Sequence, residues 1–417
     1  MKSPFIPVLK NANFLKLWVS QILSQLTINV VNFLLIAKIF EKTGSSIAVS
    51  FLWISYALPA IFLLPIAGTV VDSVNRRLVL FFTNLLQAAT IMLFLPLGHK
   101  FYAIFPIVFL YSSLNQFYIP AEAASIPDLV PQKYLAAANS LFFITSQAMF
   151  ILGFGLSGPL LSLLGPQLPF IISVLMLLIA AAATAFLPDR KPTHKKSLTS
   201  NMANFWEEFK VGYEYIKSQR GLFFPLVILV AGNLLISVTA ATFPLIGQDI
   251  LGSGIRETGI TLTLPVGLGA LLSGYLIPRL IHRVRRRQLI EVGMFILALG
   301  ILFFALVVPE IGNVFPHTKN IRLIFGMPTI LLMGFASIMV FIPSQTIVQE
   351  RTPEDLRGRI LSASSFLMTI VSIIPLIFGS AIAEVLGIRT TLILVAFLVA
   401  IALFYSRKLG DKYMIKV

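Results

Sequence analysis

The chain is a succession of long apolar runs separated by short polar segments. Each run holds about 20 residues, the length that a helix needs to cross the hydrocarbon core of a bilayer. The alternation of apolar and polar residues that marks transmembrane β-strands is absent, so the pattern predicts an all-α membrane protein with twelve transmembrane helices. We expect these helices at residues 14–38, 46–70, 77–97, 101–120, 138–164, 166–187, 221–247, 258–281, 288–308, 321–348, 359–386 and 388–406.

The twelve segments divide into two halves that share a plan. Pro59 and Gly68 are repeated, at a common offset, as Pro265 and Gly274. A second correspondence relates Pro131 and Gly165 to Pro353 and Gly387 at a slightly larger offset, so the halves differ in loop length. Internal repeats of this kind are typical of transporter folds. We therefore expect two pseudo-symmetric six-helix halves, residues 1–187 and 221–417.

Residues 188–220, between the halves, interrupt the apolar pattern with prolines and basic residues. We expect a cytoplasmic linker. In its second part the apolar residues share one helical face, opposite the charged ones, which predicts an amphipathic helix. This helix could lie on the cytoplasmic leaflet or pack on cytoplasmic loops. The apolar face consists of Met202, Phe205, Trp206, Phe209, Tyr213 and Ile216.

Composition agrees with a membrane location. The chain is 57% hydrophobic and 12% charged, with a mean hydropathy of +0.90, far from the values of soluble domains. The net charge of +15 would suggest nucleic acid in a soluble protein, but most of the 32 Lys and Arg residues fall in cytoplasmic loops if the N-terminus is inside. This bias follows the positive-inside rule. We expect a multi-pass protein of the plasma (inner) membrane with both termini cytoplasmic and no nucleic-acid partner.

The first apolar segment is long and lacks a small-residue cleavage site, so residues 1–13 do not predict a cleaved signal peptide. The chain has no cysteine, and its four histidines are scattered, so neither thiol chemistry nor a histidine metal site is indicated. A glycine-rich phosphate loop is missing too, which argues against ATP hydrolysis by this chain. We expect no cofactor and no enzymatic activity, and transport would then use a gradient or be passive.

One loop carries a specific motif. Residues 68–77 read Gly-Thr-Val-Val-Asp-Ser-Val-Asn-Arg-Arg and join two apolar segments. They resemble the signature loop between helices 2 and 3 of the major facilitator superfamily. Other stretches are similar to the drug-exporter branch that includes macrolide-efflux and siderophore-export proteins. These are Asn13-Phe14 with Leu17-Trp18, Pro120-Ala121 through Leu129-Val130, Ala138-Asn139-Ser140-Leu141, and residues 352–359.

The resemblance implies a gating role for the signature loop, which in this family helps to latch the two halves on the cytoplasmic side. Gly68 would let the second helix approach a neighbour closely, and Asp72 would face the positive N-terminal end of the eleventh helix. The alternative is a solvated turn whose arginines only set the topology. The residues assigned to gating are Gly68, Asp72, Arg76, Arg77, Arg357 and Arg359.

A second resemblance is partial. Gly153, Gly155 and the Gly158-Pro159 pair on the fifth predicted helix are similar to the glycine-rich motif of antiporters, but the glycines that follow the proline in the family are missing here. Small residues also permit close helix packing in membranes. The motif therefore favours export and leaves a structural role open.

Candidate substrate contacts come from polar residues within the apolar segments, because such residues are costly unless they face a cavity or a partner. Amides on the first helix fall on one face at 100° per residue, as do polar residues of the fourth helix if that helix continues past Pro120. In the family, helices 1, 4, 7 and 10 surround the central cavity; hydrogen bonding between helices is the alternative. The candidates are Gln21, Gln25, Asn29, Asn32, Tyr111, Asn115, Tyr118, Asn233, Ser237 and Gln345.

Proton coupling needs a carboxyl group whose protonation depends on conformation. Glu122 is the leading candidate, with a solvated acid at the cytoplasmic end of the fourth helix as the alternative. Asp128, Glu350 and Glu384 come next. Because related exporters often carry an acid where this chain has Asn29, their coupling scheme does not transfer directly.

Few acids or bases stand between the helix ends, so a strongly charged substrate would lack its counter-ion. We expect a small, lipophilic, amphipathic substrate exported by alternating access, in exchange for protons on the family pattern. Movement of lipid or lysolipid on the same fold is the alternative, and a scaffold or membrane enzyme is a third. The partners expected are the substrate, membrane lipids and protons. The resemblance implies a monomer.

Overall fold

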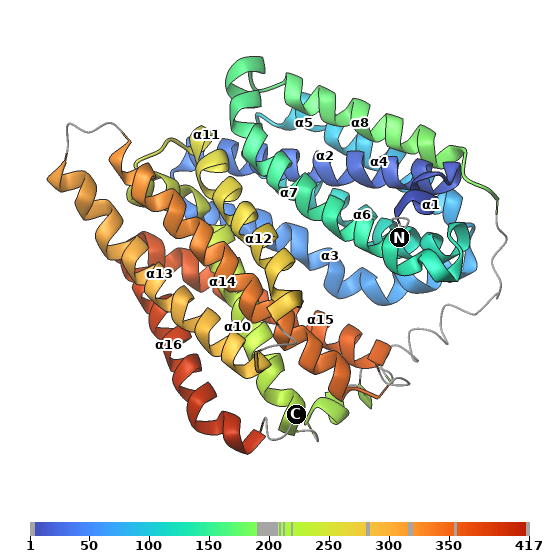
Figure 1. The fold of residues 1–417 in the computed structure, drawn as a ribbon. Helices are drawn as coiled ribbons and strands as arrows, with labels where there is room; N and C mark the ends of the chain where they lie inside the picture. The colour runs from blue at the N-terminus through green and yellow to red at the C-terminus, as the bar shows by residue number, and fades with distance from the viewer. Residues whose placement is uncertain are drawn as a thin grey trace. The chain divides into compact units, whose positions relative to one another are not determined.

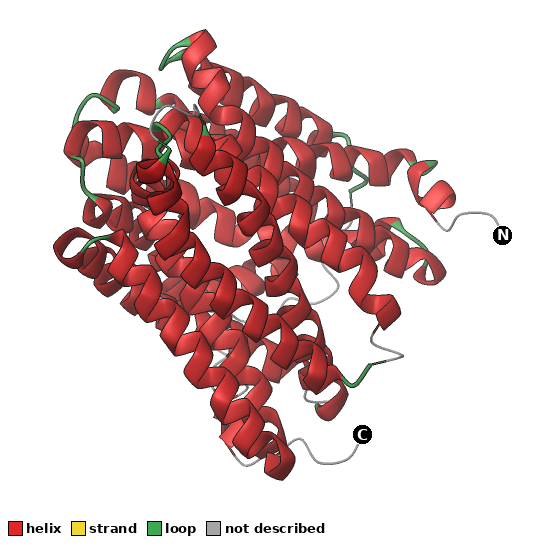
Figure 2. Cartoon of the chain, turned by 60° about the vertical axis from the view of Figure 1, so that its left-hand side comes forward, coloured by secondary structure: helices red, strands yellow, loops and turns green. Residues whose placement is uncertain are grey.

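The computed structural model describes residues 5–189, 207, 210–211, 213–217, 220–280, 284–315, 320–353 and 357–413. Within these ranges the chain is helical and contains no strand, as Figure 2 shows. The chain divides into two compact units. The first contains residues up to Ile39 together with Phe51–Phe205, and the second contains Phe40–Ser50 together with Trp206–Val417.

The helices of the first unit follow the predicted segments closely. In Figure 1 they run from blue at the N-terminus to green. The break after Met92 divides the third predicted segment into two helices. The elements are α1 Phe5–Leu9, α2 Ala12–Thr43, α3 Ser46–Ser73, α4 Arg76–Met92, α5 Phe94–Leu97, α6 Phe101–Leu129, a 3₁₀ turn at Gln132–Tyr134, α7 Leu135–Leu164 and α8 Leu168–Ala185, with the end of α2 and the start of α3 in the second unit.

The second unit contains the remaining long helices, coloured from yellow-green to red in Figure 1. Two π-helical stretches, η2 Ile246–Leu251 and η3 Gly259–Thr263, interrupt the helices at the turn between the first two of them. The other elements are α10 Arg220–Leu245, α11 Ile255–Thr258, α12 Leu264–Leu280, α13 Arg286–Val314, α14 Ile321–Arg351, α15 Arg357–Leu386 and α16 Ile388–Tyr413.

The repeat predicted from sequence has a counterpart in the backbone. Gly165 ends α7 and Gly387 follows the last residue of α15, and both adopt the left-handed conformation, with φ of 74° and 83°. A residue with a Cβ is strained there, so glycine is the expected choice at both turns. At the other matched pair, Gly68 and Gly274, an added Cβ would meet no atom within 4 Å. Among the described residues, the close approach expected at Gly68 is therefore not found.

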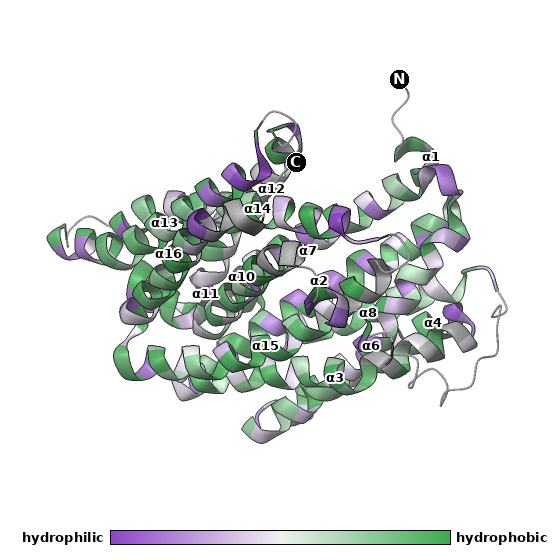
Figure 3. Cartoon of the chain, turned by 90° about the horizontal axis from the view of Figure 1, so that it is seen from below, coloured by the Kyte–Doolittle hydropathy of each residue, from purple (hydrophilic) through white to green (hydrophobic). Residues whose placement is uncertain are grey.

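Eleven helical segments of the described chain are long and apolar enough to cross a membrane. The helix α6, which covers the fourth predicted segment, is not among them because polar residues such as Asn115 and Gln116 lower its hydropathy. Large apolar side chains remain exposed on the helices, among them Leu163, Phe397 and Phe82. In Figure 3 much of the helix ribbon has the green of hydrophobic residues. Lipid is the solvent that suits such a surface.

The helix α6 continues past Pro120 to Leu129. Proline is tolerated within membrane helices because neighbouring helices and local adjustments satisfy the freed backbone groups. The four polar residues predicted to share one face of this helix, Tyr111, Asn115, Tyr118 and Glu122, therefore do lie on a single helix.

The amphipathic helix predicted in the linker is described only in part. Residues 213–217 are helical, and Tyr215 and Ile216 pack against buried Leu226, Leu229 and Val348. Met202, Phe205, Trp206 and Phe209, which define most of its apolar face, lie outside the described residues.

Candidate functional site

A buried polar chain crosses the first unit and ends on Glu122. The Asn84 amide of α4 donates to Ser20 Oγ of α2 (3.1 Å), and Ser20 Oγ lies 3.1 Å from the hydroxyl of Tyr118 on α6. The Tyr118 hydroxyl donates to Glu122 Oε1 at 3.0 Å. Since each hydroxyl has one proton, Ser20 must donate to Tyr118, and all three bonds point toward the carboxyl group.

Glu122 is only 9% exposed, and Tyr118 is 1% exposed. The alternative of a solvated acid at the end of the helix is wrong for this structure, because α6 extends beyond Glu122 and buries it. No described Lys or Arg contacts this carboxyl group; its hydrogen-bond partner is Tyr118. A buried charge without a cationic partner is costly, so this group has a physical reason to gain or lose a proton when its surroundings change.

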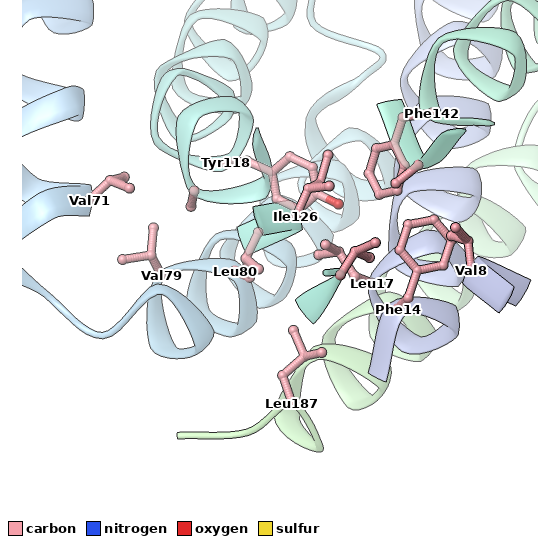
Figure 4. Packing of buried hydrophobic residues seen from close by; sticks show 13 residues of the cluster. Val8, Phe14, Leu17, Val71, Val79, Leu80, Tyr118, Ile126, Phe142 and Leu187 are labelled. Atoms are coloured by element: carbon pink, nitrogen blue, oxygen red, sulfur yellow. The ribbon is translucent and has the colours of Figure 1, made fainter. Parts of the chain in front are cut away.

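Apolar side chains from six helices and the adjoining turns surround this end of the first unit. Figure 4 shows the Tyr118 ring, with its hydroxyl oxygen, among these side chains. Their packing excludes water from the neighbourhood of the Tyr118 hydroxyl, which strengthens its hydrogen bond with Glu122. The buried cluster consists of Val8, Phe14, Leu17, Val71, Val79, Leu80, Tyr118, Ala121, Ile126, Val130, Ala138, Phe142 and Leu187.

A second polar group joins α6 to α3. The Asn115 amide donates to the Tyr56 hydroxyl (3.1 Å), and Ser112 Oγ donates to the Tyr56 carbonyl (2.6 Å). The Trp53 ring lies edge-on to the Tyr56 ring, with centroids 6.4 Å apart. Tyr111 is buried, and its hydroxyl has no hydrogen-bond partner among the described residues. The group combines flat apolar surfaces with an amide and phenol hydroxyls.

Two amide side chains of α2 donate hydrogen bonds to backbone carbonyl groups of the protein. Gln21 Nε2 donates to the Phe142 carbonyl of α7 (2.8 Å), which is the interhelical alternative considered above. Asn29 Nδ2 donates to the Gln25 carbonyl of its own helix (2.7 Å). Asn32 is buried and Gln25 half-buried. Gln21 Oε1 is buried without a partner among the described residues, so this end of the amide remains open to an unassigned polar group.

Gly153 on α7 is a packing residue. A Cβ added there would lie 2.5 Å from Asn29 Cβ and 3.3 Å from the Val30 nitrogen of α2, so only glycine permits this helix approach. At Gly155, an added Cβ would meet nothing within 4 Å. The first glycine of the antiporter-like motif therefore has a structural reason to be there.

We expect Gly153→Ala to destabilise the protein by about 1–3 kcal/mol, the usual cost of overpacking, and Gly155→Ala to have little effect. Thermal unfolding in detergent, followed by tryptophan fluorescence, measures the difference. Equal melting temperatures for the two variants would contradict the close approach of α7 and α2.

The candidates of the second unit lie on two helices, α10 and α14. Ser237 on α10 is buried and donates to the Asn233 carbonyl of its own helix (2.9 Å), while Asn233 and Gln345 are half-buried. The hydroxyl of Ser237 is thus already engaged, whereas the two amides retain polar atoms for other contacts. Substrate contact by this group remains a prediction.

The signature loop contains a well-defined ion pair. Asn75 caps the start of α4, because its side chain accepts a hydrogen bond from the Arg77 nitrogen (3.0 Å). The Arg76 side chain, in the first turn of α4, reaches α6. Arg76 Nη1 bonds to Asp128 Oδ2 (2.6 Å) and to the Ala124 carbonyl (2.8 Å). Asn75 also bonds to Asp189. The loop is therefore fixed to the end of α6 within the first unit.

Among the other gating residues, Arg77 has a described side chain. The side chains of Asp72, Arg357 and Arg359 lie outside the described part of the structure, and Arg77 is half-buried. The latch across the halves therefore stays a prediction.

The lower-ranked proton candidates are bonded to neighbours. Asp128 pairs with Arg76, and Glu350 accepts a bidentate bond from Arg286 on α13, with one arm at 2.8 Å. Glu384 accepts hydrogen bonds from Ser45 and Ile47. Among these acids, only Glu122 combines burial with the absence of a cation. Within the described residues, no group of three His, Asp or Glu side chains could hold a metal ion.

Sequence reasoning missed Tyr56, Ser20 and Asn84. Each is a single polar residue in an apolar run, and its partner lies at least 59 positions away along the chain. Periodicity on one helix could not detect these contacts.

Known proteins resemble most of the chain. Macrolide efflux protein A of Streptococcus pyogenes is 25% identical over 388 residues, which cover 90% of each chain. An uncharacterized MFS-type transporter of Bacillus subtilis, YfiS, is 22% identical over 350 residues, 84% of this chain and 81% of that protein. The first of these relatives is named as an efflux protein and the second as a transporter, and neither is named as an enzyme.

Solved structures share the fold. The nucleoside transporter NupG superposes with a TM-score of 0.71 at 15% identity, covering 96% of this chain and 99% of the other. The POT family transporter PepTSo superposes with a TM-score of 0.74 at 12% identity, covering 98% and 99%. At such identities the likeness concerns the fold alone. The family model described as Major Facilitator Superfamily matches residues 17–375, and this chain, a multi-pass membrane transporter, belongs to that superfamily.

Proposed function

We propose that this transporter exports amphipathic, lipophilic small molecules, and that macrolides are the first substrates to test. The observation that carries the proposal is the group formed by Trp53, Tyr56, Tyr111 and Asn115, which offers aromatic faces beside an amide and hydroxyls and contains no charged residue. Such a surface suits a large apolar molecule with scattered oxygen atoms better than an ion. The similarity to macrolide efflux protein A supports the same class of substrate.

Export would proceed by rocking of residues 1–187 against 221–406 about a midplane site, in exchange for protons carried by Glu122. Burial without a cation, at the end of a directed hydrogen-bond chain, supports this role. The buried carboxyl group would be neutral while enclosed, and would release its proton when the conformation opens it to water.

The experiment uses purified protein in proteoliposomes of known orientation. Efflux of a radiolabelled macrolide and of lipophilic dyes is followed with and without an imposed pH gradient, against vesicles without protein. We expect gradient-dependent movement of the macrolide. A labelled nucleoside and a fluorescent lysolipid serve as comparison substrates. Movement of the lysolipid alone would overturn export in favour of lipid flipping, and movement of the nucleoside alone would overturn the substrate class.

The cytoplasmic latch has its own test. We expect Asp72→Asn to slow the transport cycle several-fold while substrate affinity stays within about twofold of wild type, because the change removes a charge from the gate and not from the binding group. Initial rates and equilibrium binding give the two quantities. Glu214→Gln, at an exposed position of the linker, is the matched control. An unchanged rate in Asp72→Asn would remove the latch role.

A further inference from the structure

A line of buried polar side chains continues from the Tyr118 hydroxyl along α2 and α4. Three hydroxyl residues of α2 fall within about 60° of one another at 100° per residue, and four polar residues of α4 are buried as well. None of the seven is more than 6% exposed, and none is charged. This set, here called the polar line, consists of Ser20, Ser24, Thr27, Thr83, Asn84, Gln87 and Thr90.

Gln87 has no internal hydrogen bond for its side chain. It is fully buried, and neither its amide nitrogen nor its amide oxygen has a partner among the described residues. Asn84 Oδ1, three residues earlier on α4, is unpartnered in the same way, and residues at this spacing are neighbours on one face of a helix. A buried polar atom left unpaired costs about 1–3 kcal/mol. Three such atoms within one turn therefore indicate a polar ligand between the helices.

Water is the ligand that fits these three atoms. Two of them are acceptor oxygens and the third belongs to an NH₂ group, so the ligand must both donate and accept hydrogen bonds. It must also be small, because Leu80, Ala88 and Ile91 of the same helix are buried around it. Internal waters typically make about three hydrogen bonds to buried polar groups. An ion suits the place less well, since the polar line contains no charge.

Packing in this fold does not require the two amides. The helix α13 of the second unit corresponds to α4, since Arg286 begins α13 as Arg76 begins α4. At this offset Met294 and Leu297 stand where α4 has Asn84 and Gln87, and both belong to a buried apolar cluster. The corresponding helix thus packs with apolar side chains alone at these positions. The amides of α4 therefore have a reason other than packing.

The polar line extends from Tyr118 in one direction only. Since α2 and α4 are separated by a single crossing, α3, they run in the same direction, which is outward for the cytoplasmic N-terminus expected from the charge distribution. Gln87 lies about 4.5 Å further outward than Asn84. In the opposite direction the next turn is apolar, because Leu17 and Leu80 belong to the cluster around Tyr118 (Figure 4). Polar surroundings for water therefore lie on the external side.

We propose that Gln87 and Asn84 hold internal water, and that Glu122 receives its proton from the external side through this water. The proposal rests on the proton-coupled export proposed above. A water on the Asn84 oxygen lies beside Ser20 Oγ, because the nitrogen of the same amide bonds to that atom. Gln87 is a positioning residue, since it binds the water and does not touch the carboxyl group.

The proton passes along the hydroxyl groups in one concerted step. Water gives a proton to Ser20 Oγ, Ser20 gives its own proton to the Tyr118 oxygen, and Tyr118 gives its own to the Glu122 carboxylate, along the hydrogen bonds already described. One proton enters and one arrives, and each hydroxyl still has one. The hydroxyls then rotate back to their starting orientation. The apolar cluster keeps water from Tyr118 itself, so the last two carriers are side chains.

Infrared difference spectroscopy of proteoliposomes, between high and low pH, measures the water and the proton in one sample. Bands of internal water are those that shift in H₂¹⁸O, and protonated Glu122 gives the carboxyl C=O band that is missing in Glu122→Gln. We expect Gln87→Leu to lose the water bands and to slow the appearance of the carboxyl band at least about tenfold after an external acid jump. The midpoint pH of that band should stay unchanged, which a merely structural role would not predict.

Gln116→Leu is the matched control, since Gln116 of α6 is also buried but donates to the Ser112 carbonyl of its own helix. It is expected to leave the water bands and the protonation rate unchanged. Gln87→Asn, which keeps an amide one carbon shorter, should give an intermediate rate. This second variant carries the test if Gln87→Leu fails to fold.

Identical water bands in wild type and in Gln87→Leu would overturn the water site, and an unchanged protonation rate after their loss would overturn the route. Absence of the carboxyl band in wild type would overturn both the route and the proposed proton coupling. Protonation of Glu122 that depends on Gln87, without gradient-driven movement of macrolide in the vesicles, would support the route and overturn the proposed export.

Discussion

Glu122→Gln is expected to abolish pH-gradient-driven export, with at least about a tenfold fall in the gradient-dependent rate. Glutamine has nearly the same shape and can still accept the hydrogen bond from Tyr118, but it cannot carry a proton. Substrate exchange without a gradient should persist, because the aromatic group around Tyr56 is untouched. Uptake of labelled substrate into proteoliposomes, with and without an imposed gradient, separates the two activities.

The directed hydrogen-bond chain sharpens this prediction. Asn84, Ser20 and Tyr118 all donate toward the Glu122 carboxyl group, so they stabilise its charged form against the cost of burial. When the carboxyl group is protonated, Oε1 can still accept from Tyr118, but the bond loses its charge-assisted strength. Protonation is thereby linked to the contacts that hold α2 and α4 against α6.

Tyr118→Phe is the informative companion variant. It keeps the carboxyl group and removes its hydrogen-bond donor, so export should remain gradient-dependent at a lower rate. Glu350→Gln, which alters an acid paired with Arg286, should leave the coupling unchanged. Gradient-driven export at the wild-type rate in Glu122→Gln would show that the coupled proton binds elsewhere.

Most of the helices follow from the sequence. Apolar residues are costly to expose to water and unpaired backbone groups are costly to expose to lipid, so apolar segments of bilayer length form helices. The repeat was visible as well: Gly165 and Gly387 have the same left-handed conformation. These properties depend on local composition and on single backbone positions. They do not require knowledge of which helices pack together.

The sequence did not predict the buried environment of Glu122. Ending the fourth apolar segment at Pro120 placed this residue near water, whereas α6 continues to Leu129 and buries it. The membership of Phe40–Ser50 in the second unit was not predicted either, because Ser45 and Ile47 donate hydrogen bonds to Glu384 at the far end of the sequence. Contacts between distant polar residues leave no periodic signal along the chain.

Gly269→Ala and Gly334→Ala are expected to cause the largest losses of stability. A Cβ at Gly269 of α12 would lie 2.0 Å from the Leu331 carbonyl oxygen, and one at Gly334 of α14 would lie 2.3 Å from the Val266 carbonyl oxygen. In both cases the obstacle is backbone, which cannot rotate away as a side chain can. Each alanine must push α12 and α14 apart, at a cost of about 3 kcal/mol or more.

Gly274→Ala on the same helix α12 is the matched control, since a Cβ there would meet nothing within 4 Å. Gly300→Ala is a graded case, because its obstacle is the flexible Met333 side chain at 2.9 Å. We therefore expect melting temperatures in detergent to fall in the order Gly274→Ala, Gly300→Ala and then the two backbone-limited variants. A melting temperature for Gly334→Ala as high as that of Gly274→Ala would contradict the close packing of α12 and α14. The order follows from what surrounds each glycine, since all four substitutions add the same single carbon to a helix.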